Sequence, residues 1–129
     1  MGRFEQLIAV TEAHCDALHH VNNVVYVQWL QDIAAAHWNS KVPADINASV
    51  VWMLRKWEIE YKAQAFPGDV LRIDTWTGNH SAVTWDRHFT ITRVADNQTI
   101  LTATSVWILI DQSTGKPKRI DETILNVLA

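Results

Sequence analysis

The stretch Asp16-Ala17-Leu18-His19-His20-Val21-Asn22-Asn23-Val24-Val25-Tyr26-Val27-Gln28-Trp29 decides how the rest of this chain is interpreted. An acid, two histidines and two asparagines stand directly before a long apolar segment, so the polar residues lie where a helix is about to begin. The start of a helix presents unpaired backbone N–H groups and a partial positive charge. A carboxylate held there could attack, or activate water to attack, a carbonyl that the N–H groups polarise.

The segment that follows is predicted to be a helix over residues 22–38, and its composition indicates how it is packed. Only Gln28, Gln31 and Asp32 form a polar stripe on it. A helix that is apolar on nearly all sides is buried on most of them. Another part of the chain must therefore cover this helix.

Strands that could cover the helix are expected at residues 3–13, 50–63, 69–77, 82–95 and 98–110, and a short final helix at 122–128. In the second of these strands the alternation predicts one apolar face, formed by Val51, Met53, Trp57, Ile59 and Tyr61. Alternation with period two indicates a sheet with one solvated face, and short turns between successive strands favour antiparallel pairing. The predicted class is α+β, with one long helix against a curled antiparallel sheet.

Length and composition exclude several classes of protein. The 129 residues suit a single domain over 1–129, with a formal charge of −3 and no basic stripe for nucleic acid. One cysteine excludes an intrachain disulfide, and no segment has the length of a membrane span or the apolar core of a secretory signal. We therefore expect a cytoplasmic protein. Seven tryptophans raise the expectation of a homo-oligomer.

The pattern Asp-x-x-x-His-Val-Asn-Asn-x-x-Tyr-x-x-Trp over residues 16–29 resembles the signature of hot-dog-fold acyl thioesterases. It is similar to the acyl-CoA branch near 4-hydroxybenzoyl-CoA thioesterase and to acyl-ACP thioesterases. Residues 61–69 and 111–120 are similar to further parts of that family. The resemblance implies a five-stranded antiparallel sheet wrapped around one central helix. It also implies dimers, or dimers of dimers, with active sites between subunits.

The resemblance assigns Asp16 as nucleophile or general base and His20 as a residue that hydrogen-bonds the substrate or orients the carboxylate. A backbone N–H near His20 to Asn23 would polarise the thioester carbonyl. For Asn22 and Asn23, capping of the helix is an equal alternative to a catalytic role. Asp32 is a second candidate for the base.

The acyl group needs an apolar slot, and Tyr26, Trp29, Trp57 and Tyr61 are candidates to line it, although each residue type also occurs as plain core. No metal or cofactor is expected, because His14, His19 and His20 have no second cluster with ligand spacing.

Two positions depart from the family pattern, and they keep other functions open. Leu18 stands where acyl-ACP thioesterases carry Asn, which favours acyl-CoA over acyl-ACP as substrate, and Gln31 stands where related acyl-CoA enzymes carry Glu. The leading function is hydrolysis of an acyl-CoA to the free acid and coenzyme A. The alternatives are an acyl-ACP thioesterase and a protein that binds acyl-CoA without catalysis.

Overall fold

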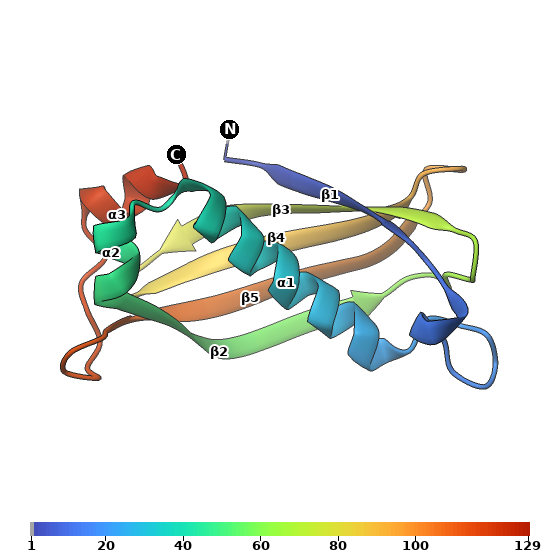
Figure 1. Cartoon of the computed structure of the whole chain (residues 1–129), viewed down its shortest axis with the longest axis horizontal. Coiled ribbons are helices and arrows are strands. Elements are labelled where there is room, and N and C mark those ends of the chain that lie inside the picture. Colours follow the sequence, from blue (N-terminus) through green and yellow to red (C-terminus); the bar gives the residue numbers. More distant parts are fainter. Residues whose placement is uncertain (1) are drawn as a thin grey trace.

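A computed structural model of the chain describes residues 2–129 and shows a single antiparallel sheet crossed by one long helix (Figure 1). The elements follow one another as β1 (Phe4–Ala9), η1 (Glu12–His14), α1 (Asn23–Lys41), α2 (Ala44–Ser49), β2 (Val50–Tyr61), β3 (Val70–His80), β4 (Thr84–Arg93), β5 (Thr99–Asp111) and α3 (Glu122–Val127). The strand order in the sheet is β1-β3-β4-β5-β2, with every pair antiparallel. The expected α+β hot-dog arrangement is confirmed.

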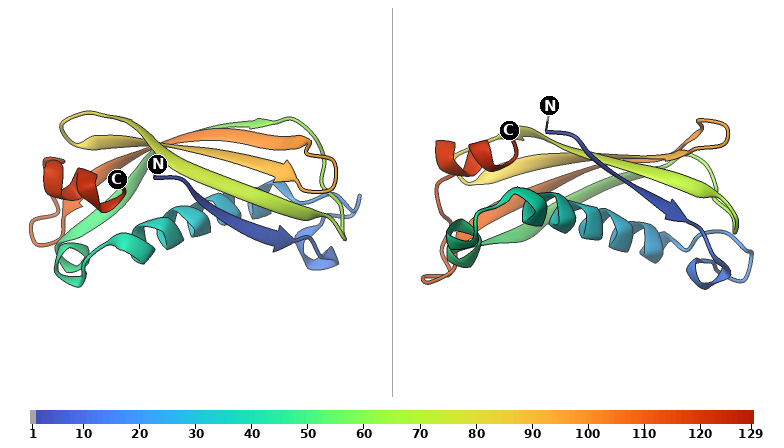
Figure 2. Two further views of the ribbon diagram at one scale, coloured as in Figure 1. Left: turned by 90° about the horizontal axis from the view of Figure 1, so that it is seen from above. Right: turned by 45° about the horizontal axis from the view of Figure 1, so that its top comes forward.

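Helix α1 lies under the concave face of the sheet, and the sheet curves over it (Figure 2). Its buried residues include Tyr26, Leu30 and Ile33, which pack against inward-facing residues of the sheet such as Phe89 and Ile91. The side chain of Asn22 caps the helix by accepting a hydrogen bond of 3.0 Å from the N–H of Val24. The predicted helix is present and ends three residues later than expected. In the single chain it is not buried on most sides, because the sheet covers one side and leaves Val24, at 74%, and Ala35 exposed.

The two ends of α1 lie in different surroundings. The loop that joins β1 to α1 lies at one end of the molecule, whereas α2 and α3 gather near the other end (Figures 1 and 2). A second apolar cluster at that end contains Trp38 of α1, Trp85 of β4 and Leu128 near the C-terminus. The short helix α2, which the sequence analysis did not anticipate, begins directly after Pro43.

Strand β2 corrects one expectation. Val51 and Met53 are exposed, at 44% and 50%, and do not share a face with Trp57 and Ile59. The register with β5 shifts between Leu54 and Lys56, which marks a β-bulge. A bulge adds one residue to a strand and reverses the side to which later side chains point. Before the bulge, the residues facing inward are therefore Val50, Trp52 and Leu54.

Candidate active site

The loop between η1 and α1 is closed by its own backbone. The N–H of Asp16 donates to the carbonyl of His20 at 2.9 Å, and the N–H of His19 donates to the carbonyl of Asp16 at 3.0 Å. Cys15 and Val21 form a β-bridge across the base of the loop. His19 has a φ of 60°, a left-handed conformation that few side chains adopt. The loop is thus a tight, defined turn directly before the helix.

The carboxylate of Asp16 is held by this turn. Its Oδ1 accepts hydrogen bonds from the N–H groups of Leu18, at 2.9 Å, and His20, at 3.3 Å. Within residues 2–129, Oδ2 receives no hydrogen bond, and the side chain is exposed in the single chain. One oxygen is therefore bonded to the turn and orients the carboxylate, whereas the other has no hydrogen-bond partner among the described residues.

The start of α1 offers one free backbone donor. The N–H of Val24 is taken by the side chain of Asn22, and the N–H groups of Val25 and Tyr26 donate to the carbonyl of Asn22. In the described part of the chain the N–H of Asn23 has no acceptor. The positive end of the helix therefore presents this N–H to solvent or to a ligand.

The histidines of the motif have different neighbours. The ring of His20 packs edge-on against Phe66, with ring centroids 5.2 Å apart. His19 Nδ1 lies 3.2 Å from Glu12, and His14 Nδ1 accepts a hydrogen bond of 3.0 Å from the N–H of Thr11. His20 thus shares the turn with Asp16 through its backbone, while the ring of His19 lies beside Glu12 of η1 and the ring of His14 packs edge-on against Trp29 of α1 at 5.1 Å.

Three of the four aromatic residues proposed to line the acyl slot contribute to the core. Tyr26 is 2% exposed, and burial raises the pKa of its phenol to about 12. Its ring contacts those of Trp29, at 5.7 Å, and Tyr61, at 5.9 Å, and Trp57 packs on Phe89 at 5.3 Å. Tyr61 is exposed. None of the four lines the more enclosed, apolar pocket of the described residues.

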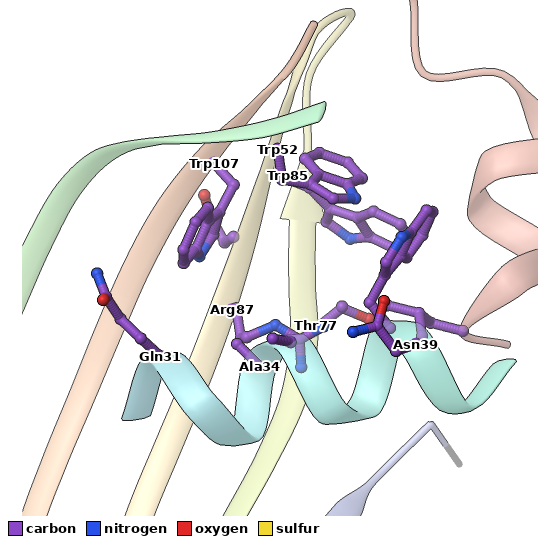
Figure 3. Close-up of a pocket in the computed structure, with 12 residues that line it drawn as sticks. Gln31, Ala34, Asn39, Trp52, Thr77, Trp85, Arg87 and Trp107 are labelled. Atoms are coloured by element: carbon purple, nitrogen blue, oxygen red, sulfur yellow. The ribbon is translucent and has the colours of Figure 1, made fainter. Parts of the chain in front are cut away.

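That pocket, of about 210 Å³, lies between the C-terminal half of α1 and the inner face of the sheet (Figure 3). It is mainly apolar and receives side chains from every strand except β1. The residues that border it are Gln31, Ala34, Ala35, Trp38, Asn39, Trp52, Thr77, Trp85, Asp86, Arg87, Trp107 and Leu128. At about 1.5 Å of rise per residue, Ala34 lies about 16 Å along the helix from Asn23.

Arg87 is the functional candidate that the sequence analysis missed. It is 6% exposed, and its Nη1 lies 2.9 Å from Nδ1 of His37 and donates to Oγ1 of Thr75 at 3.0 Å. Burial lowers the pKa of Arg87 to about 10, so the guanidinium is charged at neutral pH. Burial and the neighbouring Arg87 lower the pKa of His37 to about 4, so this imidazole is neutral. The sequence could have indicated that Arg87 faces inward, because the alternation of β4 places it on the same face as Trp85 and Phe89.

Solved structures with the same fold come from several bacteria. A hypothetical protein from Staphylococcus aureus, solved in complex with CoA, superposes with a TM-score of 0.88 at 16% identity, covering 98% of this chain and 81% of that one. A 1,4-dihydroxy-2-naphthoyl-CoA thioesterase from Synechocystis gives a TM-score of 0.83 at 18% identity, covering 98% and 95%. A probable thioesterase from Escherichia coli gives 0.82 at 22%, covering 96% and 95%.

A curated relative is the chloroplastic acyl-[acyl-carrier-protein] hydrolase FATB3 of Cuphea viscosissima, 23% identical over 84 residues. The match covers 65% of this chain but 20% of that enzyme. In the described residues, no helix combines the length and apolar character needed to cross a membrane. The model of the thioesterase-like superfamily matches residues 10–128, and the chain belongs to this family.

Proposed function

We propose that this member of the thioesterase-like superfamily hydrolyses an acyl-CoA to the free acid and coenzyme A, with Asp16 as nucleophile or general base. The observation that carries the proposal is the carboxylate of Asp16, which the turn before α1 fixes through Oδ1 and leaves open at Oδ2. A carboxylate is ionised at neutral pH and needs no further activation to act. The free N–H of Asn23 supports the proposal as a donor for the thioester oxygen.

Two routes fit these groups. In the covalent route, Oδ2 of Asp16 adds to the carbonyl carbon, the C–S bond breaks, and coenzyme A leaves as a thiolate. Water then hydrolyses the resulting anhydride and restores the carboxylate. In the general-base route, Asp16 takes a proton from water as the oxygen adds to the carbonyl carbon, and the thiolate leaves. In both routes a backbone N–H stabilises the negative charge that develops on the carbonyl oxygen.

The pocket beside α1 is the proposed site of the acyl group. Ligand pockets are mostly apolar with a few placed polar groups, and the tryptophan rings with Arg87 match that description. The pocket lies along the helix from the proposed catalytic turn, so an acyl chain lying against α1 could join the two. The four aromatic residues expected to line the acyl slot do not border this pocket. They are proposed to support it from the neighbouring core; these residues are Tyr26, Trp29, Trp57 and Tyr61.

Acyl-ACP is the second candidate substrate, and the relative from Cuphea favours it, since its name specifies an acyl-carrier-protein hydrolase. Leu18 favours CoA, because the family pattern for acyl-ACP enzymes places a polar Asn at this position. Leu18 is 73% exposed at the tip of the turn, where it would meet the carrier rather than the core. The substrate expected here is therefore acyl-CoA.

A homo-oligomer is part of the proposal. Both edges of the sheet, β1 and β2, lack a second neighbour in the single chain, and β2 exposes Val51 and Met53. Edge strands with free N–H and C=O groups pair readily with another copy. The exposed position of Asp16 agrees with a site that a second subunit completes.

A thiol-release assay tests the proposal. The purified protein is incubated with acyl-CoAs of several chain lengths and with matched acyl-ACPs, and free thiol is followed over time. We expect turnover with acyl-CoA and little with acyl-ACP. Binding of acyl-CoA without release of thiol would contradict the proposed hydrolysis and indicate a protein that binds acyl-CoA without catalysis. A single turnover in ¹⁸O-labelled water separates the routes, since label entering Asp16 requires the covalent one.

A further inference from the structure

Arg87 differs from two other arginines of the sheet, Arg72 and Arg93, in having no acidic partner. Arg72 on β3 lies 3.3 Å from Asp74, and Arg93 on β4 lies 3.1 Å from Asp69 and 3.0 Å from Asp96. Arg87 is the most deeply buried of the three, and among the described residues no carboxylate forms an ion pair with it. A buried charge is costly unless a group of opposite charge or several hydrogen bonds compensate it.

The two protein partners of Arg87 leave its charge uncompensated. Thr75 is neutral, and His37 accepts through Nδ1 because a guanidinium has only donors. The proton of the imidazole is therefore on Nε2, which is buried without a partner. Both contacts use Nη1 alone, so they fix the guanidinium without occupying Nε or Nη2.

Arg87 is one of the residues that line the pocket. Arg87 extends from β4 between the tryptophans of the sheet and the helix (Figure 3). Asp86 also borders the pocket, yet it makes no ion pair with Arg87. The planar fork of Nε and Nη2 matches the two oxygens of a carboxylate, which it binds through parallel hydrogen bonds.

Four tryptophans line the same pocket, namely Trp38, Trp52, Trp85 and Trp107. Such a wall suits a hydrocarbon, whereas the single buried cation suits an anion at one point of it. We infer that the substrate is a thioester whose acyl group carries a second carboxylate at its far end, which binds Arg87. This inference rests on the proposed function, because it treats the pocket as the acyl site of a thioesterase.

The test uses three CoA thioesters of equal chain length, which end in a carboxylate, in the methyl ester of that carboxylate, or in a methyl group. We expect kcat/KM for the carboxylate to exceed that for the methyl ester by about tenfold or more, because hydrogen bonds to a charged group are among the strong ones. Arg87→Met should reduce this ratio to near one. Arg87→Lys keeps the charge but loses the fork, and should give an intermediate ratio.

Arg72→Met is the matched control, since it removes an arginine from the neighbouring strand whose charge Asp74 already compensates. It should leave the ratio as in the wild type. Circular dichroism melting of each variant reports folding, and Arg87→Gln serves as a further variant should Arg87→Met be unfolded. A wild type that hydrolyses the methyl-terminated thioester as well as the carboxylate-terminated one overturns the inference and leaves the proposed function intact.

Failure of the proposed function gives a different result, which is no thiol release from any of the three. Binding of the corresponding non-hydrolysable thioether analogues, measured by calorimetry, then decides the inference. Weaker binding of the carboxylate analogue by Arg87→Met, by about tenfold, supports it, and equal binding overturns it. A further outcome overturns the inference: a simple fatty acid inhibits the wild type but not Arg87→Met, while the wild type hydrolyses the three thioesters equally well. Arg87 would then bind the carboxylate of a free fatty acid and not a second carboxylate of the substrate.

Discussion

The two ends of α1 present reactive groups in opposite ways. At the N-terminal end, Asp16 and Asn22 lie in solvent-exposed loop and cap positions, and each is bonded to nearby backbone N–H groups. At the C-terminal end, Arg87 and His37 are buried under the sheet, and each keeps a polar edge that no described residue satisfies. The first set is organised by local sequence, and the second by strands far apart in the chain.

A site formed by residues close together in the sequence can be predicted from the sequence, whereas a site formed across the sheet cannot. A motif of close spacing, such as residues 16–29, is visible in the sequence because its members serve one turn. The pair Arg87 and His37 is separated by 50 residues and becomes a unit only when β4 passes over α1. This contrast matches the two roles proposed above, which are cleavage of the thioester at the first end and binding of the acyl group at the second.

The substitution expected to reduce activity most is Asp16→Asn, at the N-terminal end of α1. Asp16→Asn keeps an oxygen that can accept the N–H groups of Leu18 and His20 but removes the charge. We expect thioester hydrolysis to fall by at least about a hundredfold, as is typical for loss of a catalytic base or nucleophile, with an unchanged melting temperature. Asp32→Asn, on the surface of α1 beside Gln28, is the control and should retain activity. The reverse result would transfer the role of base to Asp32.

A smaller reduction in activity is expected from a substitution that narrows the pocket at the C-terminal end of α1. Ala35 borders the pocket and is exposed, so Ala35→Phe should fill part of the pocket while the chain still folds. Hydrolysis of long-chain acyl-CoA should fall by roughly tenfold, whereas acetyl-CoA should be affected little. Ser40→Phe, on the same helix but outside the pocket, is the matched control. Equal loss with both chain lengths would show that the pocket does not hold the acyl chain.

A pH titration tests whether His37 is as enclosed as the structure shows. Its pKa is lowered from 6.5 to about 4 in the folded protein, so the unfolded chain binds the proton first as the pH falls. The contribution of this residue to the free energy of unfolding should therefore decrease by roughly 3 kcal/mol between about pH 6.5 and pH 4, and change no further below that. Chemical denaturation of wild type and His37→Gln across this range measures the difference. Parallel curves would contradict the prediction.

The smallest effect separates the two asparagines at the first end. Asn22→Ala removes the cap of α1 and should cost about 1 kcal/mol of stability, whereas Asn23→Ala, whose side chain makes no hydrogen bond in the described chain, should cost a few tenths at most. Urea denaturation of both variants gives the comparison. Equal losses would mean that Asn23 also supports the turn.

The sequence was sufficient for features that repeat locally. The apolar character of residues 22–38 predicted a helix, which the sheet covers on one side, and the alternation of Trp85, Phe89 and Ile91 predicted which face of β4 points inward. The helix continues to Lys41 because a stop signal comes only with Val42 before Pro43, whose ring disfavours helical backbone at the preceding residue.

Other features could not be read in this way, because they depend on contacts across the sheet. Arg87 interrupts an apolar face, but no sequence pattern shows that Thr75 and His37 would hold it there. Arg55 and Lys56 are both polar, so nothing in the pattern showed which of them is the extra residue. The tryptophans of the pocket come from α1, β2, β4 and β5, and only the fold brings them together.

The bulge in β2 makes the strand behave as two separately phased segments. Deletion of Arg55 would restore a continuous alternation through the whole strand, in which Trp52 and Leu54 keep the inner face together with Trp57 and Ile59. A regular strand of the same length, without the bulge, would instead carry Trp52 on the outer face, away from the indoles of Trp38 and Trp85 that it contacts. The irregular pairing between Leu54 and Lys56, rather than the side chain of Arg55, therefore keeps both segments of the strand facing the core.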